Sequence, residues 1–127
     1  MNVGVLLVSD IAPNRTSRAA RPPASSAEVT NLALVLGISR WDPTYPEPPY
    51  RLYSSFPITH RGRLCIAAEQ PLAAGAPIFV RFAVGAAGTL LGALRADADA
   101  GKAVAAPYLF VIAATDADGL AVVEVRL

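Results

Sequence analysis

The sequence predicts an all-β protein, a compact antiparallel β-barrel or β-sandwich of short strands with an extended N-terminal arm and a Pro-rich loop. Three observations lead to this fold class. Apolar residues recur at every second position in several segments, Gly and Pro clusters interrupt those segments at short intervals, and no segment keeps a helical period over three turns. With 127 residues, a single β domain over 1–127 is expected.

The first strand is expected in the apolar run 3–8. No positive charge precedes this run and no small-residue cleavage site follows it, so no secretory signal is expected. Residues 12–27, "APNRTSRAARPPASSA", contain Arg15, Arg18 and Arg21, three prolines and no acid. Proline excludes a stable helix interior or a central strand, so this segment is predicted to be a basic loop or extended arm.

The next strand is predicted over 29–39, "VTNLALVLGIS", where every second residue from Leu32 to Ile38 is a large aliphatic one. The small or apolar residues between them predict burial on both faces. A Pro-rich loop, 42–49, follows between Trp41 and Tyr50. Further strands are predicted at 63–69, 78–84, 89–95, 108–114 and 120–127. In the first of these, Leu64, Ile66 and Ala68 face one way, and in the last, Val123, Val125 and Leu127 lie opposite Glu124 and Arg126.

The Gly- and Ala-rich stretch 80–103 also resembles other kinds of segment. Only 13 residues separate Arg81 from Arg95, fewer than the ~18 that a membrane-spanning helix needs. "GAAG" is neither a dinucleotide nor a phosphate-loop motif, and "DADAG" (97–101) lacks the further ligands of a calcium loop. The remaining interpretation is a hairpin of 78–84 and 89–95 joined by 85–88, with one short helix possible within 96–106.

The sequence offers no convincing catalytic or metal site. His60 is the single histidine and lies five residues before the single cysteine, Cys65; on one continuous strand this odd separation points the two side chains to opposite faces. A solvent-facing histidine and an inert, half-buried cysteine are therefore expected, with no zinc site. No cofactor and no enzymatic activity are expected.

The acidic residues are interpreted as structural. Two Asp-x-Asp pairs, at 97–99 and 116–118, stand beside glycines in apparent turns, where Asp is favoured for local backbone hydrogen bonds. Glu69 and Glu124 are expected on solvent-facing strand positions.

Neither nucleic acid nor a membrane is an expected partner. The net charge is only +1, which gives no general attraction to polyanions. Aromatic and Arg residues do lie together around 40–53, but prolines interrupt them and acids dilute the charge, so they suit a protein contact better than a stacking groove.

The C-terminal half resembles the structural cement, or head-decoration, proteins of tailed bacteriophages. The similar segments are a "GR" strand start at 62–63, "LAAGAPIFVRF" with Arg81, "GTLLGALRADADAGKAVA" with an Arg-Ala-Asp exit, and the last strand "LAVVEVRL". Upstream, "LALVLG" (32–37) is similar to the family's strand before its variable loop. The resemblance covers roughly 29–127.

The resemblance implies a non-enzymatic virion protein, made in the host cytoplasm, that sits as a homotrimer on the outer surface of the capsid head. There it would bridge copies of the major capsid protein and stabilise the shell against internal genome pressure. The predicted contacts are the arm and the Pro-rich loop, each of which is otherwise a solvated loop. The six residues predicted to make them are Arg15, Arg18, Arg21, Trp41, Tyr45 and Tyr50. The alternative is a small β-barrel binding module that binds nucleic acid or belongs to a phage tail.

Overall fold

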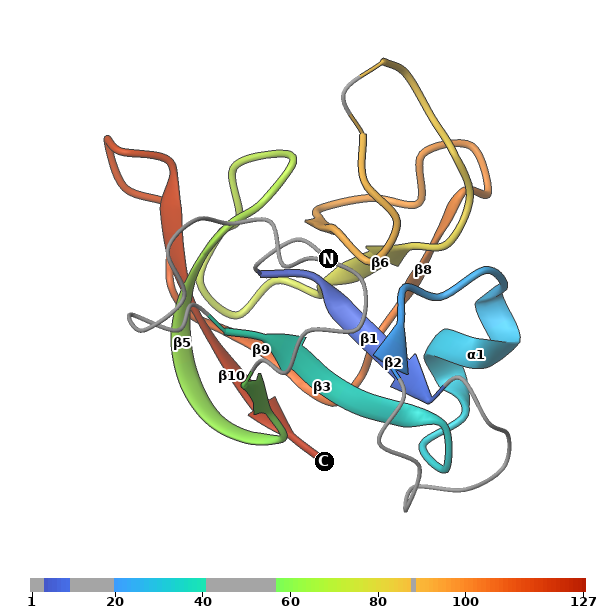
Figure 1. Ribbon diagram of the computed structural model, residues 1–127. Helices are drawn as coiled ribbons and strands as arrows, with labels where there is room; N and C mark the ends of the chain where they lie inside the picture. Colours follow the sequence, from blue (N-terminus) through green and yellow to red (C-terminus); the bar gives the residue numbers. More distant parts are fainter. Residues whose placement is uncertain (1–3, 10–19, 41–56, 88) are drawn as a thin grey trace, which may run out of the picture.

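The computed structural model describes residues 4–9, 20–40, 57–87 and 89–127 (Figure 1). They form an all-β protein of three small antiparallel sheets and one short helix, which confirms the predicted class. The described strands do not close into a barrel. Within the described ranges, no helix has the length and apolar character needed to cross a membrane.

The first sheet has the strand order β2-β1-β3-β4. Its strands are β1 (Leu6–Ser9), β2 (Ala20–Arg21), β3 (Val35–Ser39) and β4 (Ile58–Thr59). All four residues of β1 are buried, as expected for an apolar run at the centre of a sheet. Gly37 of β3 has a φ of +138°, and a Cβ there would collide with the carbonyl of Thr59, so only glycine allows β3 and β4 to approach this closely.

The second sheet has the strand order β5-β10-β9. Its strands are β5 (Arg61–Ala67), β9 (Leu109–Ala113) and β10 (Leu120–Arg126). β5 and β10, with 7 residues each, are the longest of the described strands. In β10 the odd-numbered Val123 and Val125 are buried while Glu124 and Arg126 point outward, as the alternation predicted. In β5, Ile66 is buried and Leu64 packs against the core. This sheet therefore has one face on the core and one facing out.

The third sheet, β7-β6-β8, includes the predicted hairpin. Its strands are β6 (Phe79–Arg81), β7 (Leu94–Arg95) and β8 (Ala103–Ala105). β6 pairs with β7, but the paired strands are shorter than predicted and a long loop, 82–93, joins them. The short helix considered within 96–106 is absent: 96–102 is a turn and β8 follows it. Asp99 and Ala100 have positive φ values of 44° and 53°, which end any helical path.

A single hydrophobic core draws residues from all three sheets. Backbone hydrogen bonds also link the sheets: Leu6 N donates to Gly92 O at 2.8 Å, and Glu69 N donates to Leu94 O at 2.9 Å. The completely buried aliphatic residues of the core, each at 0% exposure, are Leu6, Val8, Val29, Val35, Ile38, Val80, Leu94 and Val123.

The prediction of one strand over 29–39 is wrong in its first half. Ser26–Thr30 forms helix α1, and the strand begins only at Val35. Ser25 caps the helix by accepting a hydrogen bond from Glu28 N, and the S-x-x-E spacing of these two residues is a helix-start signal. Leu32, one of the predicted buried residues, is 50% exposed.

The predicted loop or extended arm, 12–27, contains short regular elements where the structure describes it. Ala20–Arg21 pairs with β1 as the edge strand β2, and residues 26 and 27 belong to α1. An edge strand tolerates the prolines at 22 and 23 that a central strand would not. The C-terminal half of the segment, residues 20–27, thus contributes to β2 and α1, and residues 12–19 lie outside the described residues.

Candidate interaction surface

Only Arg21, among the six residues predicted to contact a partner, lies in the described part of the chain. Its guanidinium Nη1 donates to Glu28 Oε2 at 2.6 Å, and its side chain is 37% exposed. Arg21 therefore contributes to joining β2 to α1. The other predicted contact residues, Arg15, Arg18, Trp41, Tyr45 and Tyr50, lie outside the described residues.

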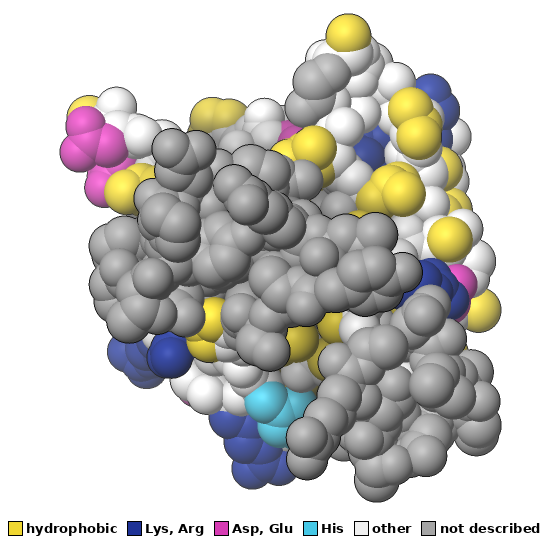
Figure 2. Space-filling model, in the orientation of Figure 1, with side chains coloured by type: hydrophobic (Ala, Val, Ile, Leu, Met, Phe, Trp, Pro, Cys, Tyr) yellow, Lys and Arg dark blue, Asp and Glu magenta, His cyan; other side chains and the backbone are white. Residues whose placement is uncertain are grey.

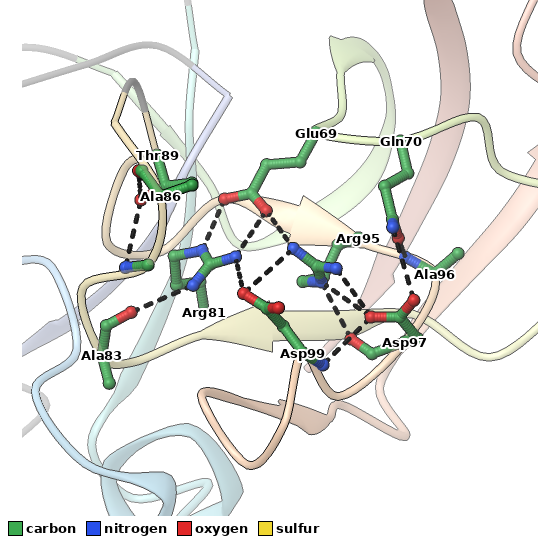
Figure 3. A network of polar contacts seen from close by, with 11 residues as sticks. Glu69, Gln70, Arg81, Ala83, Ala86, Thr89, Arg95, Ala96, Asp97 and Asp99 are labelled. Atoms are coloured by element: carbon green, nitrogen blue, oxygen red, sulfur yellow. Dashed lines mark hydrogen bonds and ion pairs between the residues drawn. The ribbon is translucent and has the colours of Figure 1, made fainter.

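A network of charges joins Glu69, which follows β5, to residues of the third sheet and its 96–102 turn (Figure 3). At its centre is Arg81, whose side chain is 1% exposed. Arg81 Nε donates to Glu69 Oε1 at 2.6 Å, and its Nη2 donates both to Glu69 Oε2 at 2.9 Å and to Asp99 Oδ2 at 2.5 Å. Its Nη1 donates to Ala83 O at 3.2 Å. All three nitrogens of this buried guanidinium are therefore satisfied, as burial requires.

Arg95 extends the network to the next turn. Its Nη1 donates to Glu69 Oε2 at 2.6 Å, so one carboxylate bridges both guanidinium groups. Its Nη2 donates to Asp97 Oδ1 at 2.7 Å. Asp97 Oδ1 also accepts a hydrogen bond from Asp99 N, which holds the 96–102 turn in place. The aspartates thus have the predicted turn role and additionally bind the buried arginines.

The pKa values in this network follow from its hydrogen bonds. Arg81 lowers the pKa of Glu69, and its burial only partly opposes that effect. Burial alone would lower the pKa of Arg95, but the hydrogen bonds to Asp97 and Glu69 raise it. Asp97 has its pKa lowered chiefly by Arg95, and Asp99 chiefly by Arg81. The five charged groups of the network, Glu69, Arg81, Arg95, Asp97 and Asp99, are therefore ionised at neutral pH. We call this network the clamp, because it holds segments together by ion pairs and has no group poised for proton transfer.

The network holds the ends of an exposed, uncharged loop, residues 82–93. Arg81 and Arg95 flank this loop, which rises at the top of the molecule in Figure 1. Two of its apolar side chains are accessible to solvent, Val84 at 75% and Leu90 at 43%. Thr89 Oγ1 accepts from Gly85 N at 3.2 Å and donates to Ala86 O at 2.8 Å, so the loop also has internal hydrogen bonds.

Gly85 is required at the point where this loop meets the network. A Cβ on Gly85 would lie 2.9 Å from the Arg81 Cζ and closer still to Nη1. The guanidinium cannot move aside without losing its hydrogen bonds to Glu69 and Asp99. The loop therefore has no room for a side chain at position 85 while the Arg81 guanidinium keeps these hydrogen bonds.

The outer face of the second sheet is the other large accessible surface. Arg126 pairs in register with Arg61, and Glu124 with Arg63, at one end of β5 and β10. Arg126 lies over the exposed ring of Phe110, 4.2 Å from its centroid. A hollow of ≈ 420 Å³ opens at this end. It is lined by Arg61, Gly62, Glu124, Val125, Arg126 and Leu127.

His60 and Cys65, the other residues considered for catalysis, are placed as follows. His60 is exposed, with Nδ1 3.1 Å from Leu36 O. Cys65 is exposed in β5, so the expectation of a half-buried cysteine is wrong. Within the described ranges, no group of three or more His, Cys, Asp or Glu residues could hold a metal ion.

The role of Glu69 was not predicted from the sequence. Glu69 was expected to face solvent, but it lies between Arg81 and Arg95. The sequence did contain one sign of such a role. Arg81 stands within the apolar strand segment "IFVRF", and an arginine that is buried there needs a carboxylate partner.

Compared with models of known families, with curated proteins and with solved structures, the chain gives no match. The fold and the surface described above are therefore the basis for a function.

Proposed function

We propose that this chain is a structural cement, or head-decoration, protein of a tailed bacteriophage. It would bind as trimers to the outer surface of the assembled icosahedral head, bridge neighbouring major capsid proteins and act without catalysis. After synthesis in the host cytoplasm it would become part of the virion.

One observation carries the proposal: the residues by which the chain resembles cement proteins make the buried clamp. Arg81 belongs to the similar "IFVRF" segment, and Arg95 and Asp97 form the Arg-Ala-Asp exit. These three side chains are linked through Glu69 and Asp99. The segments that resemble cement proteins thus contain the charged residues that hold the two ends of the exposed loop 82–93.

A fixed, exposed apolar loop suits a protein whose task is contact. Surfaces that are already ordered before binding lose less entropy when a partner covers them. Val84 and Leu90 would lose water-exposed apolar area in such a contact. We therefore assign the loop 82–93 as a contact with the capsid, in addition to the predicted residues Arg15, Arg18, Trp41, Tyr45 and Tyr50.

The proposed mechanism depends on several weak contacts acting together. Once one subunit of a trimer is bound, the contacts of the others become intramolecular, so the whole stays bound although each contact is weak. A protein that binds only the assembled shell stabilises that shell by mass action. Internal genome pressure then has to break several contacts at once.

Decoration of heads tests the proposal. Heads of the encoding phage that lack this protein should bind it to saturation, with immunogold label over the head in electron micrographs. The variant Val84→Asp/Leu90→Asp should stay folded but lose most of its occupancy. Leu32→Asp, which changes an exposed leucine far from that loop in the sequence, is the control and should bind normally. Label on tails, or bare particles, would contradict the proposal.

The alternative, a binding module for single-stranded nucleic acid, requires a basic surface with an aromatic ring on which a base can stack. Arg61, Arg63 and Arg126 supply charge near Phe110. However, the guanidinium of Arg126 already covers the Phe110 ring. The contacts therefore favour the cement proposal over this alternative.

A further inference from the structure

The second sheet carries opposite charges at its two ends. Arg61 and Arg126 are paired at one end, beside the hollow. The β9–β10 turn at the other end contains Asp116 and Asp118, which are both exposed. Figure 2 shows acidic side chains at the upper left, where the β9–β10 turn of Figure 1 lies, and basic side chains below.

These charges cannot neutralise one another within a single molecule. The strand β10, Leu120–Arg126, separates them by roughly 20 Å at ~3.4 Å per residue. Charges on a surface are largely screened beyond about 8 Å at physiological ionic strength. No ion pair joins Asp116, Asp118 or Arg61 to another side chain within the described ranges. Each end is thus available to a partner of opposite charge.

The basic end of the second sheet has the features of a binding site for an acidic group. Arg126 is held by Phe110 beneath it and by Glu124, whose Oε1 accepts from Nε at 3.1 Å. Arg61 Nε donates to Leu127 O, which fixes the second guanidinium across the hollow. The lining between them includes the half-buried, apolar Leu127 and the carboxylate of Glu124. The hollow therefore offers two positioned guanidinium groups, of which Arg126 is also paired with Glu124, beside the apolar side chain of Leu127.

The acidic turn is built as a compact projection. Asp116 Oδ1 accepts hydrogen bonds from Asp118 N at 2.9 Å and from Leu120 N at 3.0 Å, and Gly119 N donates to Asp116 O. The side chain of Asp118 stands at the tip, and Leu120 beside it is 40% exposed. The turn thus presents an acid and an apolar side chain together, which is the complement of the hollow.

We infer that the hollow at the end of β5 and β10 binds the β9–β10 turn of a second copy of this chain. Asp118 would meet Arg61 and Arg126, and Leu120 would pack toward Leu127. Such a contact joins two different surfaces, so repeated copies form a closed ring if the rotation between neighbours allows it, and an open chain if not. The expectation that copies of the chain associate comes from the proposed function. The inference adds which two surfaces would meet, the hollow and the β9–β10 turn.

Charge exchange between the two surfaces tests the inference on the isolated protein. Sedimentation should show concentration-dependent association of the wild type that weakens from 0.15 M to 1 M salt, where the screening length falls to about 3 Å. Arg61→Glu/Arg126→Glu and, separately, Asp118→Lys should each weaken association by about tenfold or more. Combining all three substitutions in one chain should restore it, because the complementary charges are then exchanged.

Lys102→Glu is the matched control, since it reverses an exposed charge on a turn of the third sheet and should leave association unchanged. Circular dichroism should show that every variant is folded. A wild type that stays monomeric throughout, or a triple variant that does not recover, would overturn the inference. So would a monomeric wild type that binds a DNA oligonucleotide through Arg61 and Arg126.

The outcome is separable from the proposed function. A chain that decorates heads but never uses these charges to associate would leave the cement proposal standing and remove this contact. A chain that associates through these charges but binds no head would do the reverse.

Discussion

Glu69 and Arg81 form a two-point ion pair, with Oε1 2.6 Å from Nε and Oε2 2.9 Å from Nη2, although the Arg81 side chain is 1% exposed. This geometry matches the planar fork of a guanidinium to the two oxygens of a carboxylate. The same carboxylate also binds Arg95. Glu69 is therefore the residue on which two buried positive charges depend.

Glu69→Ala should destabilise the protein strongly. Without Glu69, each buried guanidinium keeps one carboxylate partner, Asp99 for Arg81 and Asp97 for Arg95, but loses its other one. Breaking a buried pair in this way should cost about 3 kcal/mol in the free energy of unfolding. Denaturant unfolding followed by circular dichroism would measure the change. Glu124→Ala removes a carboxylate that binds the exposed Arg63 and Arg126, and it should change stability far less. Equal losses for both variants would show that the buried network does not stabilise the fold.

Stability should decline in acid because of the same network. The pKa of Glu69 is lowered in the folded protein from its ordinary value of 4.5. Its contribution is therefore fully present above 4.5 and is lost as the pH falls through the lowered value. The melting temperature should be steady from pH 7 to pH 5 and fall below that. Glu69→Gln should start lower at pH 7 and fall less steeply; parallel curves would contradict the assignment.

Gly85→Ala should disturb the loop 82–93 because the added Cβ would collide with the Arg81 guanidinium. Overpacking of this kind costs about 1–3 kcal/mol. Amide exchange at Thr89 and Gly92 would accelerate, since both amides are hydrogen-bonded within the loop and its base. Gly75→Ala is the comparison, because a Cβ there meets no neighbour although its φ of +76° is strained. Unchanged exchange in Gly85→Ala would mean that the guanidinium can move aside.

Tyr108→Phe should loosen helix α1. The buried hydroxyl of Tyr108 donates to Val29 O at 2.6 Å, and burial raises the pKa of that hydroxyl, so it remains a donor at all ordinary pH. Removing it leaves a buried carbonyl unsatisfied, which costs about 1–3 kcal/mol. Thr30→Val removes exposed hydrogen bonds from the hydroxyl to Ser26 O and Ala27 O and should have a small effect. Equal melting temperatures for Tyr108→Phe and the wild type would contradict this.

The fold class followed from the sequence because alternation reports directly which side of a strand is buried. Val123, Val125 and Ile66 were placed correctly on this basis, and β5, β9 and β10 lie close to the predicted ranges. Alternation failed at 29–34 because a short helix with one buried residue, Val29, contains too few apolar positions to show a helical period.

The buried clamp could not be located from spacing alone. Glu69 is 12 positions from Arg81 and 26 from Arg95, so only the pairing of the sheets brings them together. The aspartates were assigned to turns correctly, but their second role depends on Asp99 adopting a φ of 44°, which points its side chain toward Arg81. Local turn chemistry was visible in the sequence, while contacts across sheets were not.

The clamp at Arg81 and Arg95 has a practical consequence for redesign. It fixes both ends of the loop 82–93, so the tip around Ala86 and Ala87, both exposed, contributes little to the core. Doubling the length of a flexible loop costs only about 0.6 kcal/mol in closure entropy. A foreign peptide inserted at that tip should therefore be displayed on a stable body. Because this loop is also the proposed contact with the capsid, such an insertion would separate folding from decoration: the body should stay folded while the inserted peptide blocks attachment to heads.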